Sequence, residues 1–163
     1  MERGAVFSPC GRYRYALWRS WAPAAPVLLI VGLNPSRADA QRDDPTSRRC
    51  IDFARRWGFG GCWLANLFAY CAAKPAVLAT IPDPVGGDND RWLTCLSAQS
   101  DAILVAWGQG GSLAGRDAEV LAGPLSGYRL DCLGRCQAGQ PRHPLYVRAD
   151  APMQPFEAHT PTH

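Results

Sequence analysis

Three short, continuous apolar runs constrain the fold of this chain more than any other feature. They occupy residues 27–33 (VLLIVGL), 61–66 (GCWLAN) and 101–107 (DAILVAW). An apolar run without polar alternation is typical of a strand that is covered on both faces. Helical patterns separate the runs, one over residues 45–57 and another that begins at Asp88 or Asn89 and ends near residue 100. Buried strands that alternate with helices predict a three-layer α/β/α fold around a central, mostly parallel sheet.

The remaining segments predict shorter elements around this sheet. Basic and aromatic residues alternate over residues 12–18, as in a half-exposed strand. Residues 74–87 are rich in proline and glycine and allow one helical turn at most, whereas residues 114–121 predict a short helix. A fourth strand is expected within residues 128–134, followed by a loop (QPRHPLYV) and a last extended piece. We expect a single domain over residues 1–152 and a flexible C-terminal tail over residues 153–163.

The composition is that of a soluble globular protein. The chain has 163 residues, of which 47% are hydrophobic and 19% are charged, and its net charge of +3 permits a polyanionic partner. No signal-peptide pattern is present and no apolar run could span a bilayer, so we expect a cytoplasmic protein without membrane contact. The seven cysteines contain no C-x-x-C pair, which favours core side chains over disulfides or metal ligands. We expect no metal and no cofactor, and the oligomeric state is left open.

Polar residues follow each of the predicted central strands. Asn34 ends the first strand, Asn66 ends the second, and the GQGG turn at residues 108–111 follows the third. Ligands bind at the carboxyl ends of parallel strands, so these residues, with His143 from the late loop, predict a site. Each also has a purely structural explanation: an Asx-Pro turn at Asn34, a satisfied strand-end amide at Asn66 and a surface position for His143.

The loop after the first central strand holds three carboxylates, Asp39, Asp43 and Asp44. They could position a nucleophilic water or act as a general base, but Asp44 could equally cap the following helix. Two arginines, Arg48 and Arg49, lie in the first turn of that helix, where cations oppose the helix dipole. Their position indicates an anionic ligand such as a phosphate.

Several segments resemble a bacterial family that is described only as a domain of unknown function, the 1643 family. They are LNPSRAD, DDPTSRRC, NLFA and GQPRHPLY, and the resemblance runs from about residue 12 to residue 152. This chain has Arg37 where the family signature often has threonine. The resemblance implies no activity.

The layout is also similar, more distantly, to that of the uracil-DNA glycosylase superfamily. In that superfamily an asparagine motif, a second asparagine, a glycine turn and a His-Pro-Ser loop follow successive strands, as GLNPS, LAN, ILVAWGQGG and the pair His143-Pro144 do here. Leu145 replaces the serine of the last motif, and Phe68 would have to supply the stacking ring. The resemblance implies a uracil-DNA-glycosylase-like fold and hydrolysis of an N-glycosidic bond.

That resemblance implies roles for individual residues. Catalysis would fall to four residues, with Asn34 and either Asp39 or Asp43 positioning the water and His143 donating to the departing base. Four residues would bind the base: Asn66, Phe68, Pro35 and Ser36. Five residues would contact phosphates or fill the gap that the base leaves: Arg48, Arg49, Arg142, Leu145 and Tyr146.

The expected partner is therefore a nucleic acid, DNA in preference to RNA, or a nucleotide. Two alternatives stay open at this point. One is a non-catalytic module that binds a nucleic acid or a modified nucleotide through the same pocket. The other is a metal-dependent phosphohydrolase that uses the loop with Asp39, Asp43 and Asp44.

Overall fold

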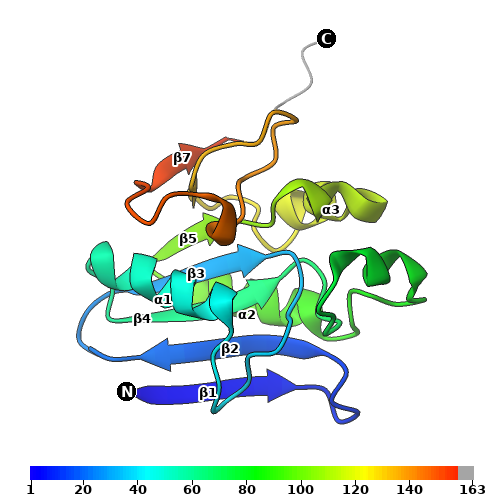
Figure 1. Cartoon of the computed structure of the whole chain (residues 1–163), viewed down its shortest axis with the longest axis horizontal. Helices are drawn as coiled ribbons and strands as arrows, with labels where there is room; N and C mark the ends of the chain where they lie inside the picture. The colour runs from blue at the N-terminus through cyan, green and yellow to red at the C-terminus, as the bar shows by residue number, and fades with distance from the viewer. Residues whose placement is uncertain (158–163) are drawn as a thin grey trace.

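The computed structural model describes residues 1–157, and its centre is a seven-stranded mixed sheet with the strand order β1-β2-β4-β3-β5-β6-β7 (Figure 1). Four central strands are parallel: β3 (Val27–Gly32), β4 (Gly61–Asn66), β5 (Ala102–Val105) and β6 (Leu130–Cys132). Antiparallel strands extend both edges: β1 (Glu2–Phe7) and β2 (Arg14–Ser20) beside β4, and β7 (Gln154–Phe156) beside β6.

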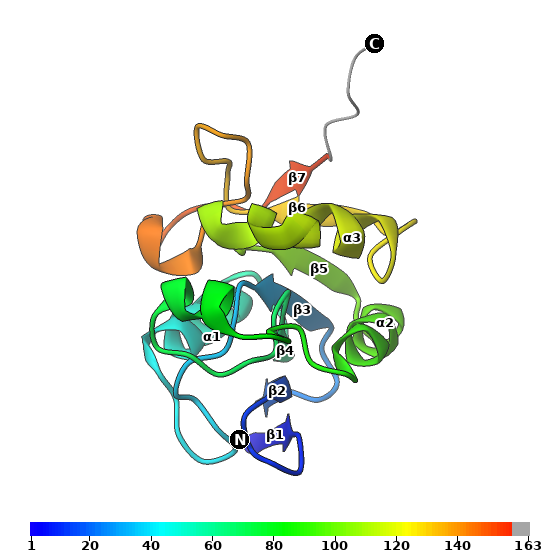
Figure 2. The ribbon, with the colours of Figure 1, turned by 90° about the vertical axis from the view of Figure 1, so that its right-hand side faces the viewer.

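Helices cover both faces of the sheet. Figure 2 shows α1 (Pro45–Arg56) and α2 (Asn89–Gln99) on opposite sides of the central strands. One core cluster joins α1 to the sheet through residues such as Phe53 and Ile30. The other joins the opposite face of the sheet to α2 and to α3 (Arg116–Ala122), and it includes Val31 and Val120. The predicted α/β fold with a mostly parallel centre and helices on both faces is confirmed.

Helix α1 begins where the sequence predicts it. Asp44 is the N-cap, and its carboxylate accepts from the Ser47 amide over 2.8 Å. The Ser47 hydroxyl accepts in return from the Asp44 amide over 2.9 Å, which completes a capping box. Such a cap is worth about 1 kcal/mol. Past the end of the helix, Gly58 has a φ of 84°, a left-handed conformation that suits glycine.

Three short 3₁₀ helices connect the larger elements: η1 (Pro75–Thr80), η2 (Gln109–Gly115) and η3 (Pro144–Tyr146). The first lies where one helical turn at most was expected, within residues 74–87, and with six residues it is longer than that. Helix α3 begins two residues later than predicted because Leu113 and Ala114 have non-helical dihedral angles. Asp88 is the N-cap of α2 but its side chain makes no capping bond, and Asn89 instead binds backbone carbonyls at the end of β4.

Two strands at the edges were not expected from the sequence. Residues 2–7 (ERGAVF) have no clear alternation, and β1 forms through its register with β2. Part of the predicted C-terminal tail is β7, in which Pro155 is tolerated because the strand lies at a sheet edge. The rest of that tail, residues 158–163, lies outside the described residues.

Three of the seven cysteines, Cys50, Cys62 and Cys132, are buried, as expected for core side chains, whereas Cys10 and Cys95 are exposed. Burial raises the pKa of Cys62 to about 12. Within residues 1–157 the helices are all too short or too polar to cross a membrane.

Candidate functional site

The carboxyl ends of the central strands meet at one edge of the sheet. Gly32 of β3 lies in register with Asn66 of β4, and Val31 lies in register with Val105 of β5. The late loop reaches the same edge, since the Gly108 amide donates to the carbonyl oxygen of Pro141 over 2.8 Å. The carboxyl ends of β3, β4 and β5 and the late loop therefore lie around the same region of the structure.

Two adjacent spaces occupy this edge. The larger, which we call the pocket, has a volume of about 700 Å³, within the range of roughly 300–1,000 Å³ that is typical of small-molecule sites. The smaller, which we call the chamber, has a volume of about 40 Å³. Leu33, Asn34 and His143 line both spaces and so form the wall between them. Asn66 lines the chamber only.

The predicted convergence of Asn34, Asn66 and His143 is therefore present, because all three line the chamber. The chamber has room for water molecules or for one small chemical group, but not for a planar base. A ring of that size fits only in the pocket, where it would meet Asn34 and His143 but not Asn66.

The amide of Asn34 has a fixed orientation. Its nitrogen donates to the carbonyl oxygens of Pro35, over 3.0 Å, and Ala72, over 2.9 Å. Both amide hydrogens are thus used within the protein. No protein donor among residues 1–157 bonds the amide oxygen of Asn34, which leaves it able to accept from a ligand or from a water.

Asn66 is buried and incompletely bonded. Its side chain is held close to β3, because a Cβ atom added to Gly32 would lie only 2.9 Å from the Asn66 amide oxygen. The Asn66 amide nitrogen is buried and has no hydrogen-bond partner in the described protein. Leaving a buried donor unpaired costs about 1–3 kcal/mol, so a hydrogen-bond acceptor that enters the chamber and pairs with this donor would be stabilised there.

His143 is half-buried and neutral at physiological pH. Burial lowers the pKa of its imidazole, and the nearby charge of Asp44 opposes this effect only in part. Its Nδ1 accepts from the Leu145 amide over 3.1 Å. In the neutral ring the hydrogen therefore lies on Nε2, which makes His143 a hydrogen-bond donor to a ligand.

Arg14 lines the chamber and was not among the predicted site residues. Asp44 also lines the chamber and was predicted only as one of the three loop carboxylates. Arg14 is buried, donates through Nη1 to the carbonyl oxygen of Ala38 over 2.9 Å and leaves Nε without a partner. Burial lowers the pKa of Arg14, and the charge of Asp44 opposes that effect. Arg14 escaped notice because it lies in a strand whose alternating pattern suggested an exposed basic face.

The other two carboxylates of the loop point elsewhere. Asp39 accepts from the amides of Gln41 and Arg42, and Asp43 pairs with Arg19 over 3.0 Å. Neither residue lines the pocket or the chamber. The structure thus corrects their placement, because local turn bonds and an ion pair hold both carboxylates. Within residues 1–157 no group of three or more His, Cys, Asp or Glu side chains could hold a metal ion.

The predicted base-binding residues are only partly brought together. Pro35 and Ser36 line the chamber. Phe68 is 1% exposed, packs in the core on the α2 side of the sheet and lines neither space. The structure corrects the stacking role expected for Phe68, because the chain turns its ring inward directly after β4.

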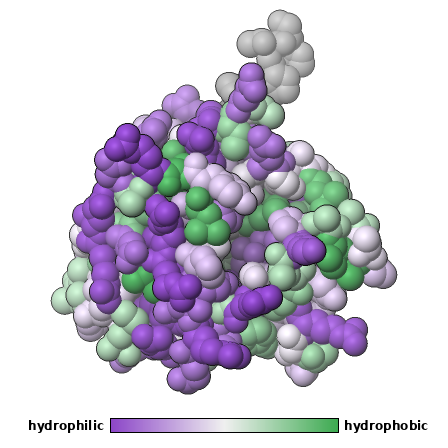
Figure 3. Space-filling view, in the orientation of Figure 1, coloured by the Kyte–Doolittle hydropathy of each residue, from purple (hydrophilic) through white to green (hydrophobic). Residues whose placement is uncertain are grey.

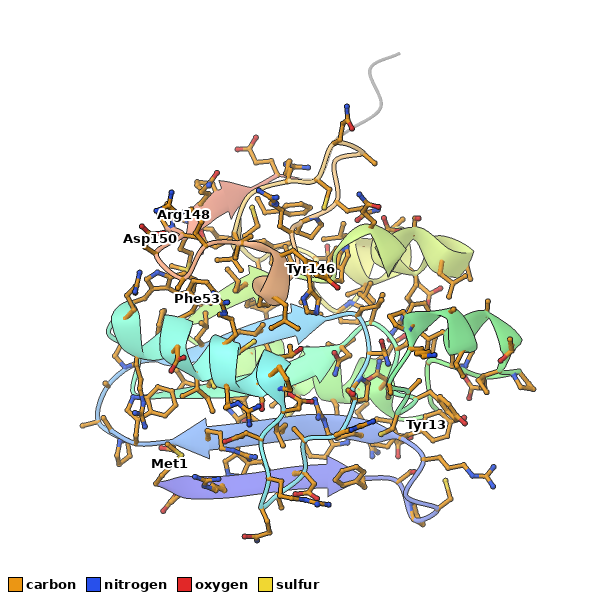
Figure 4. The ribbon with its side chains drawn as sticks, in the orientation of Figure 1. Met1, Tyr13, Phe53, Tyr146, Arg148 and Asp150 are labelled. Atoms are coloured by element: carbon orange, nitrogen blue, oxygen red, sulfur yellow. The ribbon has the colours of Figure 1, made fainter. Side chains whose placement is uncertain are left out.

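The predicted nucleic-acid contacts lie around the mouth of the pocket and along α1. Arg142 and Tyr146 line the pocket, and Figure 4 shows Tyr146 beside the tip of β3. Leu145 is exposed next to Tyr146. Arg48 and Arg49 lie on α1 outside the pocket, with long contacts of 3.4 Å to backbone oxygens. Figure 3 shows that hydrophilic side chains predominate over α1 on this face.

Sequence reasoning also missed several pocket residues, among them Trp107 and Arg135. The indole nitrogen of Trp107 donates to Gln140 over 2.8 Å, which ties the end of β5 to the late loop. The Arg135 guanidinium lies 4.3 Å from the centre of the Phe156 ring. The only sequence signal was that Trp107 ends an apolar run.

The fold and the site define an α/β protein with a ligand-sized pocket at the carboxyl ends of its parallel strands. A family model described as "protein of unknown function (DUF1643)" matches residues 14–145, and the chain belongs to that family. No match was found among curated proteins or among solved structures. The first resemblance noted in the sequence is thus confirmed, and the similarity to uracil-DNA glycosylases stays a prediction.

Proposed function

We propose that this protein hydrolyses the N-glycosidic bond of a base in a nucleic acid or a nucleotide, as uracil-DNA-glycosylase-like proteins do. One observation carries the proposal. Asn34 and His143, from separate strand ends, share the wall of a pocket of about 700 Å³, and Asn66 lies directly behind them in the chamber. The order of these residues along the chain matches the order in that superfamily.

Asn34 is suited to hold the attacking water. Its two amide hydrogens bind backbone carbonyls, so the amide oxygen of this lining residue remains as an acceptor of fixed orientation. A water that donates to this oxygen turns a lone pair toward the sugar carbon. Because the transition state resembles an oxocarbenium ion, a positioned water needs little further activation.

His143 is suited to stabilise the departing base. A neutral imidazole with its hydrogen on Nε2 can donate a hydrogen bond to the atom of the base on which negative charge develops.

Asp44 does not serve as the general base on this proposal. Its carboxylate already accepts from the amides of Ser47, Ala38 and Arg37.

That saturation of Asp44 also favours a second candidate, a module that binds a modified base or nucleotide without cleaving it. Asp39 and Asp43 are likewise committed elsewhere, and no Asp or Glu among the described residues lines the pocket. The metal-dependent phosphohydrolase has less support, because the three aspartates do not converge on one point.

Release of free base from a panel of modified single- and double-stranded oligonucleotides tests the proposal. We expect the wild type to release at least one base, and Asn34→Ala and His143→Ala to abolish release while keeping most of the binding. Tyr128→Ala, an exposed substitution away from the pocket, is the control and should retain activity. Salt-dependent binding with no product from any oligonucleotide would overturn hydrolysis in favour of the binding module.

A further inference from the structure

Two residues of the chamber each keep one buried hydrogen-bond donor without an acceptor. Arg14 and Asn66 are 5% and 6% exposed, and both line the chamber. The Nε atom of Arg14 and the Nδ2 atom of Asn66 have no partner within the described part of the chain. Buried polar groups are almost always paired in native proteins, so two unpaired donors in one small space indicate a missing acceptor.

The one carboxylate that lines the chamber does not supply that acceptor. The Asp44 carboxylate is the one anion that lines it, and both of its oxygens accept from backbone amides. The Asn34 amide nitrogen donates to carbonyl oxygens, and the proposed function assigns the remaining amide oxygen to the attacking water. His143 in its neutral form adds a further donor on Nε2. The chamber is therefore rich in donors.

We propose that the chamber binds one oxygen atom that carries no hydrogen, a carbonyl or carboxylate oxygen of the ligand, with Arg14 and Asn66 as its donors. The inference deepens the proposed function and rests on it for the position of the ligand body in the pocket. A volume of about 40 Å³ accepts such an oxygen and the carbon that bears it, while excluding a ring. An amino group at the same place would set its hydrogens against those of Arg14 and Asn66.

The same argument separates the chamber from the position of the attacking water. A water held by Arg14 and Asn66 would spend both lone pairs as an acceptor and would have none free for attack. The nucleophile belongs beside Asn34, on the pocket side of the wall. Recognition by the chamber and attack from the pocket are thus assigned to different residues of one site.

The charges around the chamber allow the bound oxygen to belong to a neutral carbonyl group or to a carboxylate. The Asp44 carboxylate lies near enough to the Arg14 cation to offset its charge, so a neutral carbonyl meets little net charge, whereas the N-terminus of α1 adds a modest preference for an anion. Formate and formamide are probes that differ in charge while offering the same kind of oxygen. Methylammonium, which has no acceptor, is the matched negative probe.

The test follows the side-chain N–H signals of Arg14 and Asn66 by NMR while the wild-type protein is titrated with each probe. We expect a saturable shift of both signals, with a single dissociation constant, for formate, formamide or both, and no shift for methylammonium. The Nε–H of Arg19 is the internal control, since it already binds Asp43 over 3.0 Å. Absence of any saturable shift, or an equal shift of the Arg19 signal, would overturn the inference.

A variant adds a second measurement. Asn66→Leu removes the donor while keeping the branched shape of the side chain, and it should weaken probe binding, read at Arg14, by about tenfold or more. Unchanged binding in the folded variant would count against the inference, and if the variant does not fold the wild-type signals decide. Probe binding without base release from any oligonucleotide would support oxygen binding in the chamber and would reject the proposed hydrolysis. Base release without probe binding would reject the inference that the chamber binds an oxygen and would leave the proposed hydrolysis standing.

Discussion

The side-chain nitrogen of Asn34 donates to the carbonyl oxygen of Ala72 over 2.9 Å and so ties the end of β3 to the loop that follows β4. Asn34→Asp replaces this donor with a carboxylate that faces two carbonyl oxygens. We expect it to lower the free energy of unfolding by about 1–3 kcal/mol, measured by urea denaturation. Gln137→Glu, the same chemical change at an exposed position, should alter stability by no more than about 0.5 kcal/mol. Equal effects of the two changes on the free energy of unfolding would contradict a stabilising role of the Asn34–Ala72 hydrogen bond.

Gly32 makes room for the Asn66 amide, because an added Cβ would lie 2.9 Å from its oxygen. We expect Gly32→Ala to displace the Asn66 side chain, to shift its NH₂ signals in NMR spectra and to reduce base release. Gly87→Ala is the control, since nothing lies within 4 Å of a Cβ there. Unchanged Asn66 signals in Gly32→Ala would show that the amide is not confined in this way.

The sequence predicts the central elements well because their signals are local. The apolar run of β3 and the capping residues of α1 specify each element within a few residues, whichever neighbours it finds. Strand β1 has no such local signal, and only its pairing with β2 makes it a strand.

The site was predictable where polar residues interrupt apolar strands, as at Asn34 and Asn66. The roles of Asp39 and Asp43 were not, because a carboxylate in a loop looks the same whether it faces a ligand or binds amides of its own turn. Arg14 shows the converse. Whether an arginine in an alternating strand is buried depends on which element packs against it, and here the loop through Ala38 covers it.

The ionisation of Asp44 makes the free energy of unfolding depend on pH in the acid range. Burial alone raises the pKa of this carboxyl, but the amides of Ser47, Ala38 and Arg37, together with the Arg14 charge, outweigh burial and lower it. The folded state therefore binds the proton more weakly than the unfolded state, whose pKa is about 3.9. The stabilisation is complete above that pH and is lost as the pH falls through the lowered folded value.

Asp44→Asn keeps a capping side chain but cannot ionise. We expect its free energy of unfolding to be below that of the wild type at neutral pH, and the difference to shrink below about pH 4. Denaturant unfolding over a pH series measures it. Asp52→Asn, an exposed change on the same helix, should show no comparable convergence. A difference that stays constant down to the lowest pH would refute the contribution of Asp44.

His143 should titrate below the ordinary histidine value of about 6.5, because burial disfavours its charged form. Its pKa can be read from the ring signals in an NMR titration, with His143→Gln to assign them. Since Asp44 partly opposes the shift, Asp44→Asn should lower the pKa of His143 further, and Asp52→Asn should not. Between about pH 6.5 and the folded value, stability should decline with acidification in the wild type but not through this group in His143→Gln. A pKa at or above the ordinary value would contradict the effect of burial on His143.

Tyr146 offers an exposed ring at the mouth of the pocket. Its side chain is 76% exposed, and the ring lies 5.4 Å from the imidazole of His143, tilted by 45°. If the ligand is a nucleic acid, a base or a sugar next to the bound nucleotide can stack there, and such stacking contributes about 1–3 kcal/mol per base. Tyr146→Ala should then weaken binding of a single-stranded oligonucleotide by roughly 5- to 150-fold at constant salt.

Tyr128→Ala is the matched control for that measurement. Tyr128 is 42% exposed, follows α3 and does not line the pocket. Because both rings lie at the surface, neither change should cost much stability, and thermal unfolding of the two variants will verify it. Fluorescence anisotropy with one labelled oligonucleotide then compares their affinities directly. A loss of affinity confined to Tyr146→Ala places nucleic acid at the mouth of the pocket, whereas equal affinities would remove Tyr146 from the binding surface and favour a free nucleotide as the ligand.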